Sequence, residues 1–274
     1  MPTLSDGEFQ LVYTLMTGAL AALAGSLLYF VLSRSTISPR YHSAMAVASV
    51  VVGVAALHYQ RLISAWTDSF EFRAGSGEWV ATGVPFSGGL RYIDWLITVP
   101  LLLAQFVLVL RLDEVTARGL IRRLVVAASL MVAVGYAGEV STVTSVKLVC
   151  WFAGFVPFAY IAYVLWVELS RSLFRYSDVV ALTIGRARTL LVVSWFAYPI
   201  AYLFPVFGWT SGTAEVARQS IYSVADVVSK VGFGLIVYRI ARLLTEQEAS
   251  GADRKSEGQV DLADAGRGFT PAGM

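Results

Sequence analysis

Seven long runs of apolar residues alternate with short polar segments along the chain. The runs lie at residues 9–33, 41–64, 90–111, 120–140, 146–168, 187–208 and 218–244. Each is close to or above the roughly 20 residues that a helix needs to cross a bilayer core of about 30 Å. The break between the fourth and fifth runs is the shortest, since it consists only of the polar stretch from Ser141 to Ser145. The pattern predicts an all-α membrane protein built as a bundle of seven transmembrane helices.

The composition indicates that lipid surrounds most of the chain. Of 274 residues, 57% are hydrophobic and 15% are charged, with a mean hydropathy of +0.65, whereas soluble domains carry about 25% charged residues. We expect one transmembrane domain at residues 1–245. Residues 246–274 are rich in Gly, Ala, Asp and Glu and almost lack large apolar side chains, which predicts a disordered tail.

Several functional classes do not fit the sequence. A net charge of +2, spread along the chain, is too small to indicate a nucleic-acid partner. The lone Cys150 excludes an intramolecular disulfide and a cysteine-based metal cluster, and we expect it to pack in the core. The first 20 residues carry Asp6 and Glu8 without a basic start region, so they do not resemble a cleaved signal peptide. The first helix is expected to serve as the insertion signal.

Basic residues concentrate in alternate loops, and their distribution predicts the orientation. They are Arg34 and Arg40 after the first run, Arg111, Arg118, Arg122 and Arg123 after the third, and Arg171, Arg175, Arg186 and Arg188 after the fifth. Loops that stay in the cytoplasm retain Lys and Arg. The N-terminus is therefore expected outside and the tail inside, and the odd-numbered helices run inward.

The segment at residues 70–87, between the second and third runs, has glycines at Gly75, Gly77 and Gly83 among apolar side chains such as Phe72 and Trp79. This pattern is typical of a short hairpin. An irregular loop accounts for it equally well.

Charged residues inside the apolar runs are few, and each is a candidate for function because a charge in lipid costs several kcal/mol unless it is paired or hydrated. Of three lysines, Lys147 lies at a helix end and Lys255 in the tail, which leaves Lys230 in the middle of the seventh run. Asp226 precedes it by four residues, on the same helix face. The pair is either a buried salt bridge that joins helices or a reactive site, since a buried lysine amine can form a Schiff base with an aldehyde.

The third run adds a second polar face. Arg91, Asp94 and Thr98 are spaced three and four residues apart, with Arg91 nearest the outside. Asp94 and Asp226 together could balance a cation at Lys230, and Arg91 could offset the excess negative charge.

Aromatic residues are dense where a conjugated ligand would need walls. They are Tyr59 on the second run, Trp95 on the third, and Trp195, Tyr198 and Tyr202 beside Pro199 on the sixth. A helical aromatic stripe by itself usually serves packing or faces lipid. Together with the buried lysine, these residues favour a binding pocket.

These residues resemble the motifs of the microbial rhodopsins. The matching segments are Arg91-Tyr92-x-Asp94-Trp95-x-x-Thr98-x-Pro100, Trp195-x-x-Tyr198-Pro199 and Asp226-x-x-x-Lys230-Val231-Gly232-Phe233-Gly234. His58-Tyr59 and Gly135-Tyr136-x-Gly138-Glu139 are similar to the proteorhodopsin and xanthorhodopsin branch. The resemblance covers roughly residues 8 to 244.

The resemblance implies a light-driven outward proton pump, not an enzyme, in the cytoplasmic membrane of a bacterium, which works among lipid, water and protons and forms a homo-oligomer. All-trans retinal would be bound to Lys230 as a protonated Schiff base, with Asp94 as counterion and proton acceptor and Asp226 as second counterion. Light-driven isomerisation to 13-cis would move the proton to Asp94. Further roles would fall to Thr98 as a partner of Asp94, to Arg91 as the gate of the outward path, to His58 as the histidine that pairs with the counterion, and to Trp95, Trp195, Tyr198, Pro199 and Tyr202 as walls of the pocket.

Three positions depart from the pattern of these pumps. Where they usually place a carboxylic acid that reprotonates the Schiff base, this chain has Gln105, an amide that cannot donate that proton. The outer end of the seventh helix offers only Glu215 and Arg218, so no release group is identified. Gly154 resembles the small residue that opens a window for an antenna carotenoid in some relatives, although a glycine there could equally serve close helix packing.

Alternative functions remain to be compared. A slow photosensor that signals through a transducer would suit the absence of an internal donor at Gln105. Chloride and sodium pumps are disfavoured, since this branch would replace Asp94 by a neutral residue or Thr98 by an acid for those ions. A retinal-free protein with a buried salt bridge would stay colourless with retinal. Leu102 stands at the position where leucine is typical of green absorption.

Overall fold

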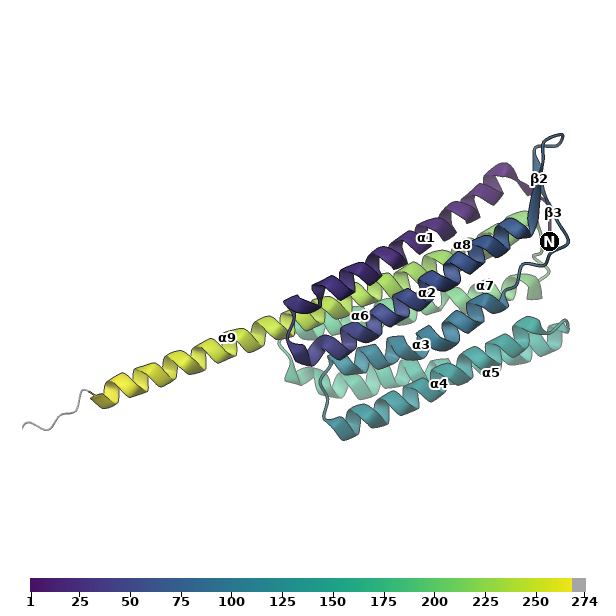
Figure 1. Ribbon diagram of the computed structural model, residues 1–274. Coiled ribbons are helices and arrows are strands. Elements are labelled where there is room, and N and C mark those ends of the chain that lie inside the picture. Colours follow the sequence, from purple (N-terminus) through teal and green to yellow (C-terminus); the bar gives the residue numbers. More distant parts are fainter. Residues whose placement is uncertain (268–274) are drawn as a thin grey trace, which may run out of the picture.

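The computed structural model describes residues 1–267 as a bundle of long helices that lie side by side (Figure 1). Seven helical segments of the described chain are long and apolar enough to cross a membrane: Asp6–Thr36, Pro39–Asp68, Gly89–Val109, Glu114–Val140, Thr144–Arg175, Asp178–Val206 and Gly212–Ser250. They coincide with the seven predicted runs, so the predicted fold class is confirmed. The hairpin and the N-terminus lie at one end, here called the hairpin end, and the long last helix leaves from the other, the tail end (Figure 1).

The first four spans are nearly regular helices. The elements are β1 (Leu4–Ser5), α1 (Asp6–Leu32), η1 (Ser33–Thr36), η2 (Pro39–Tyr41), α2 (His42–Asp68), β2 (Phe70–Arg73), β3 (Glu78–Ala81), α3 (Gly89–Val109) and α4 (Glu114–Val140). Helix α3 is the most enclosed, with 72% of its membrane-spanning window buried against at most 50% for the other spans. It therefore forms the centre of the bundle.

The last three spans are interrupted. Their elements are α5 (Thr144–Tyr163), η3 (Val164–Glu168), η4 (Leu169–Arg175), α6 (Asp178–Trp195), α7 (Ala197–Val206), α8 (Gly212–Asp226), η5 (Val227–Gly232) and α9 (Phe233–Arg267). The sixth span breaks at Phe196, because Pro199 has no N–H to donate to the carbonyl of Trp195. The seventh contains the π-helical turn η5, which includes Lys230. Such wide turns occur often at functional sites.

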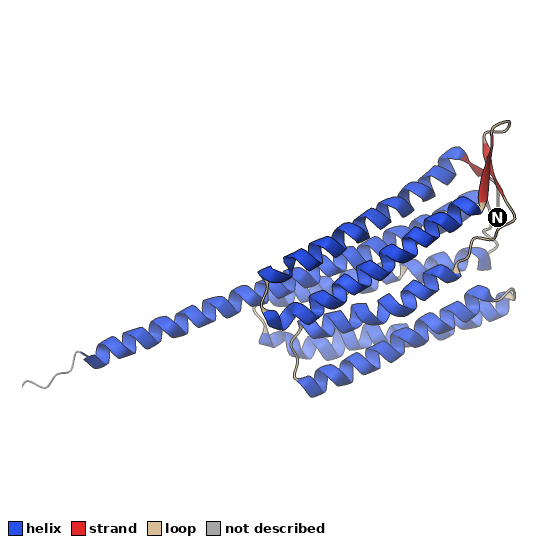
Figure 2. Cartoon of the chain, viewed as in Figure 1, coloured by secondary structure: helices blue, strands red, loops and turns tan. Residues whose placement is uncertain are grey.

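The segment between the second and third spans forms a hairpin, as one of the two interpretations predicted. Strands β2 and β3 pair antiparallel from Phe70 opposite Ala81 to Arg73 opposite Glu78, and they are the chief non-helical part of the fold (Figure 2). Gly77 takes a positive φ of 71° in the turn, which favours glycine. The N-terminal strand β1 adds to the free edge of β3, so the N-terminus closes this end of the bundle.

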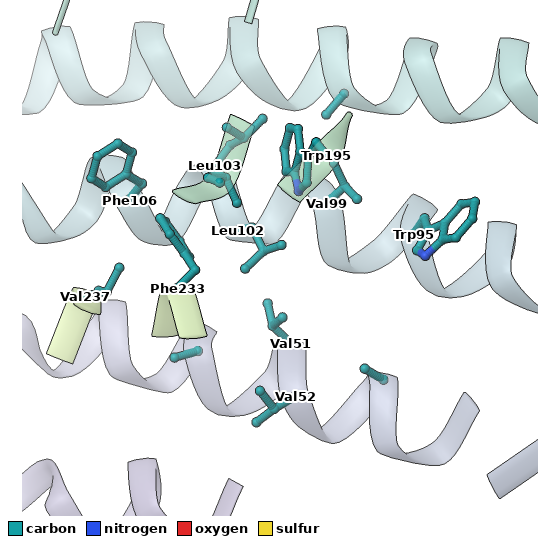
Figure 3. Packing of buried hydrophobic residues seen from close by; sticks show 14 of the residues in the cluster. Val51, Val52, Trp95, Val99, Leu102, Leu103, Phe106, Trp195, Phe233 and Val237 are labelled. Atoms are coloured by element: carbon teal, nitrogen blue, oxygen red, sulfur yellow. The ribbon is translucent and has the colours of Figure 1, made fainter. Parts of the chain in front are cut away.

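An apolar layer fills the bundle toward the tail end. Figure 3 shows Leu102, Leu103 and Phe106 of α3 packed with Phe233 and Val237 of α9 and with Val51 and Val52 of α2. The rings of Phe106 and Phe233 meet edge to face at 5.5 Å. The side chains that fill the middle of the bundle on that side are therefore chiefly apolar.

Helix α9 continues past the bundle to Arg267 and projects from it (Figure 1). The sequence predicted a disordered tail from Glu246, but Glu248 still forms ion pairs with Arg40 and Arg111 of the bundle. Contacts with the bundle therefore extend beyond the predicted boundary at residue 245. For the rest of the tail, disorder stays a prediction, and its residues 268–274 lie outside the described part.

Candidate functional site

Lys230 lies at the centre of a buried ionic cluster. Its side chain is 1% exposed, and its Nζ donates to Oδ2 of Asp94 at 2.9 Å and to Oδ1 of Asp226. The two carboxylates come from α3 and α8, so the structure brings together the three charged groups that the sequence singled out. Such burial is tolerated only because opposite charges meet.

The two carboxylates differ in their other partners. Asp226 accepts hydrogen bonds from the hydroxyls of Tyr59 (2.9 Å) and Tyr198 (2.8 Å) and from Nε1 of Trp95 (3.2 Å). Among the described residues, Lys230 is the one side-chain donor to Asp94, whose Oδ1 is buried without a hydrogen-bond partner. Asp226 is thus held as an ion by a shell of donors, and Asp94 keeps an oxygen free.

Thr98 contacts Asp94, but not through the carboxylate. Its Oγ1 donates to the main-chain carbonyl of Asp94 at 2.9 Å, one helical turn back. The bond fixes the Thr98 hydroxyl on the same face as Asp94.

Arg91 faces the hairpin side of Asp226 and does not pair with Asp94. Its Nη1 lies 3.6 Å from Oδ2 of Asp226 and donates to the Tyr59 hydroxyl at 3.2 Å. Its Nε and Nη2 donate to Oε1 of Gln219 at 3.2 and 2.9 Å. Two cations and two carboxylates are thereby buried together, as the sequence predicted. Arg91, however, pairs with Asp226 and not with Asp94 in the described structure.

Gln219 and Ser223 were not anticipated as site residues. They hold Arg91 from helix α8, Ser223 at 3.4 Å from Nη2. Their spacing did contain a signal, because Gln219, Ser223 and Asp226 follow one another at four and three residues and share a helix face. A polar face of that length inside a membrane helix marks a buried path.

The path continues toward the hairpin end. Nε2 of Gln219 donates to Oε1 of Glu215 at 2.8 Å, and Glu215 pairs with Arg218 at 3.0 Å. Arg218 also reaches Glu139 of α4 at 3.3 Å, and all three charged side chains are at most 17% exposed. Polar groups therefore extend from Lys230 almost to the surface on this side.

In the described part of the chain, neither His58 nor Gln105 forms a hydrogen bond with the ionic cluster. The half-buried His58 places Nδ1 2.9 Å from the carbonyl of Val54 in its own helix, and within the described residues no hydrogen bond joins it to Asp94. Gln105 is fully buried, and neither polar atom of its side-chain amide has a hydrogen-bond partner in residues 1–267. It follows Asp94 by 11 residues, about 16 Å along α3, on the side of the apolar layer.

A cavity with aromatic walls adjoins the cluster. Its lining residues come from α3 to α7: Tyr92, Trp95, Val99, Met131, Val132, Gly135, Cys150, Trp151, Gly154, Phe155, Phe158, Trp195, Tyr198, Pro199 and Tyr202. Trp95 and Tyr198 belong both to this wall and to the shell of Asp226, so these two side chains connect the cavity to the ionic cluster around Lys230. A buried amine with balanced charges and an apolar, aromatic cavity fit a conjugated aldehyde that is bound covalently.

Two expected wall residues have additional contacts. The Tyr202 hydroxyl donates to the carbonyl of Lys147 at 3.1 Å, and Trp195 is 3% exposed in the core. Leu102 is 1% exposed in the apolar layer and does not line this cavity.

Comparison with known proteins gives one consistent result. The family model described as "Bacteriorhodopsin-like protein" matches residues 10–244. A green-light absorbing proteorhodopsin from Gamma-proteobacterium EBAC31A08 is 29% identical over 247 residues, which cover 88% of this chain and 92% of that protein. Among solved structures, thermophilic rhodopsin has 38% identity and a TM-score of 0.88, covering 90% of this chain and 99% of that one.

A second solved structure is similar to the same extent. Xanthorhodopsin, described as a light-driven ion pump with dual chromophore, has 36% identity and a TM-score of 0.87, with 91% of this chain and 99% of that chain covered.

Proposed function

The chain belongs to the bacteriorhodopsin-like family, in its proteorhodopsin and xanthorhodopsin branch, and on this basis we propose that it pumps protons outward across a bacterial cytoplasmic membrane when illuminated. The observation that carries the proposal is the Lys230 amine, buried between Asp94 and Asp226, with Trp95 and Tyr198 of the aromatic cavity wall bonded to Asp226. The residues fit retinal, which when bound to this amine would supply the absorption of visible light and a change of shape.

The unequal surroundings of the two carboxylates support Asp94 as the proton acceptor. The three donors around Asp226 stabilise its ionised form. Asp94 has a free oxygen and lies 2.9 Å from the Lys230 nitrogen, within the distance for direct proton transfer. The N–H bond at Lys230 would break and an O–H bond would form on Asp94.

The outward path would follow Arg91. Once Asp94 is neutral, the negative charge of Asp226 would be balanced by Arg91, which Gln219 of α8 holds in place. Gln219 connects Arg91 to Glu215, which gives a proton a polar route toward the hairpin end. On the tail side of the cluster the buried side chains are chiefly apolar, which supports release toward the hairpin end.

The return of a proton to Lys230 would come from the other side. Gln105 cannot donate a proton, and apolar side chains lie around it. Reprotonation would therefore draw on cytoplasmic water and become slower as the proton concentration falls.

The decisive experiment is the light-induced pH change of cells that express the protein with retinal. Acidification of the medium that a protonophore abolishes supports the pump, and its absence in a coloured preparation rules the pump out.

A photosensor is the second candidate, and the observation in its favour is the amide at Gln105, which removes the internal donor and would prolong the cycle. A coloured protein with a slow photocycle and no net proton movement would support this alternative.

A carotenoid antenna is a further part of the proposal. Gly154 borders the cavity, and a Cβ at this position would meet only the Met131 carbonyl oxygen, at 3.9 Å. Close helix packing therefore does not require glycine here, which supports a window role. Energy transfer from an added carotenoid, seen in the excitation spectrum and lost in Gly154→Trp, tests it.

The orientation and assembly are also proposed. The arginine-rich loops favour a cytoplasmic tail end and an external hairpin end, and the exposed apolar surfaces of the spans suit lipid and a homo-oligomer. Protease access to the tail in inverted vesicles tests the first, and size analysis in nanodiscs the second.

A further inference from the structure

A polar recess lies at the tail end, above the end of α3. The lining residues are Tyr41, Leu110, Arg111, Arg175, Tyr176, Leu244, Gln247 and Glu248. Glu248 is its only acidic side chain. Its Oε1 accepts from Nη1 of Arg111 at 2.6 Å, from Nη1 of Arg40 at 2.9 Å and from the hydroxyl of Tyr41 at 2.8 Å. One carboxylate thus joins α9 to the chain segments next to α2 and α3.

The backbone at this point is held in an unusual conformation. Arg111 has a φ of 50°, the one positive value at a non-glycine residue of the described chain. That conformation is costly for a residue with a Cβ unless its surroundings hold it. The guanidinium contacts to Glu248 and the hydrogen bond from Tyr176 to the carbonyl of Leu110 provide that support. The recess is therefore a built feature of the fold.

The recess lies at the end of α3, the helix that carries Gln105. Arg111 follows Gln105 by six residues, about 9 Å along the axis, and the residues between them include the buried Val109 and Leu110. Two other acids, Asp113 and Glu168, line a separate recess between α4 and η4. Glu168 is paired there with Arg123 at 2.7 Å, and Asp113 accepts from the backbone N–H of Thr116 as the N-cap of α4. Glu248 is therefore better placed than Glu168 to serve the path along α3.

We propose that this recess is the entrance through which protons reach the tail half of α3, and that Glu248 is the residue that collects them. The inference rests on the proposed outward pump, whose cycle requires uptake at this end. A hydronium ion or a buffer acid would protonate the Glu248 carboxylate, and the O–H bond would break again as the proton passes to water leading past Gln105 to the Lys230 nitrogen.

The charges around Glu248 predict what its loss would do. The groups that bond to it or line the recess with it are Arg40 and Tyr41 of η2, Arg111 after α3, Arg175 at the end of η4, Tyr176 after η4, and Gln247 of α9. Without the carboxylate these arginines leave an uncompensated positive field that repels protons. The electrostatic potential at a narrow entrance changes the association rate of a charged species by about tenfold or more.

The test is flash photolysis of the retinal-loaded protein, with a pH-indicating dye to time proton uptake. In Glu248→Gln, the state in which the Lys230 nitrogen has lost its proton should decay about tenfold more slowly at low salt. The difference should shrink near 1 M salt, where the screening length is about 3 Å. Glu246→Gln is the matched control. Glu246 is an exposed acid on the same helix, it pairs with Arg242, and it does not line the recess.

Two further variants separate collection of protons from support of the fold. Tyr41→Phe removes one hydrogen bond to the carboxylate but keeps the charge, and Glu248→Asp keeps the acid, so both should decay near the wild-type rate. Thermal unfolding checks that Glu248→Gln is folded. An unchanged or faster decay of this state in folded Glu248→Gln at low salt overturns the proposed entrance, whether or not Glu168→Gln decays slowly. A wild type without any light-driven uptake refutes the pump itself.

Discussion

Replacing Asp94 by Asn tests whether the two carboxylates beside Lys230 have different roles. At 2.9 Å, and with an effective dielectric constant of about 20, the attraction between the Lys230 cation and the Asp94 carboxylate is about 6 kcal/mol. Asp226 remains in the variant with its full shell of donors. The cation therefore keeps one counterion, and the protein should still fold and bind retinal, with its absorption shifted to the red.

Transport should respond much more strongly than folding in this variant. An amide cannot accept the proton, and the loss of a positioned proton-transfer group costs about 100-fold or more in rate. Outward pumping in Asp94→Asn should accordingly fall below detection. The assays are the visible spectrum and the light-induced pH change, compared at equal amounts of pigment.

Asp226→Ala is the control that distinguishes acceptor from anchor. It leaves three buried donors, on Tyr59, Trp95 and Tyr198, without their acceptor, at about 1–3 kcal/mol each. The yield of pigment should fall far more than in Asp94→Asn. If Asp94→Asn pumped at the wild-type rate, or if both variants lost pigment equally, the distinction drawn from the hydrogen bonds would be wrong.

Three more outcomes are expected. Lys230→Ala should fold but stay colourless with retinal, since the other lysines lie at a helix end and in the tail; any visible pigment contradicts this assignment. In wild type, the state in which the Lys230 nitrogen has lost its proton should decay more slowly as the pH rises from about 6 to about 9, above the range where model carboxylates titrate. In Gln105→Glu this decay should be faster and depend less on pH. A wild-type decay that is fast and independent of pH would reveal another donor. Gly234→Ala should lower stability by about 1–3 kcal/mol, because the new Cβ would lie 2.6 Å from the Phe30 ring; an unchanged melting temperature argues against that packing.

The spans and the central charges were predictable from the sequence for one physical reason. Lipid imposes long apolar runs, and a charged side chain inside such a run stands out, as Lys230, Asp94 and Asp226 do. The hairpin was recognisable from its glycines, though its pairing with the N-terminal strand was not. The pairing of β1 with β3 joins segments more than 70 residues apart and depends on how helices α1 and α2 pack.

Other parts of the site depended on tertiary geometry. The sequence placed Arg91 near both carboxylates, whereas the contacts with Gln219 and Ser223 draw it to Asp226. Glu248 lay in a segment predicted to be disordered, because composition does not reveal that three side chains from distant segments converge on one carboxylate. Local patterns identify the charges but not which of them meet.

The wide turn η5 at Val227–Gly232 has a consequence for how the length of the chain can vary. Each residue of a regular helix turns the chain by about 100°. A π-helical turn holds one residue more than the α-helical turn it replaces, so deleting one residue after Lys230 within it would let the span close as a regular α-helix while the helices on both sides keep their faces. A one-residue deletion should therefore be tolerated better in this turn than in the regular helices, and a single-residue deletion scan with pigment colour as the readout tests this.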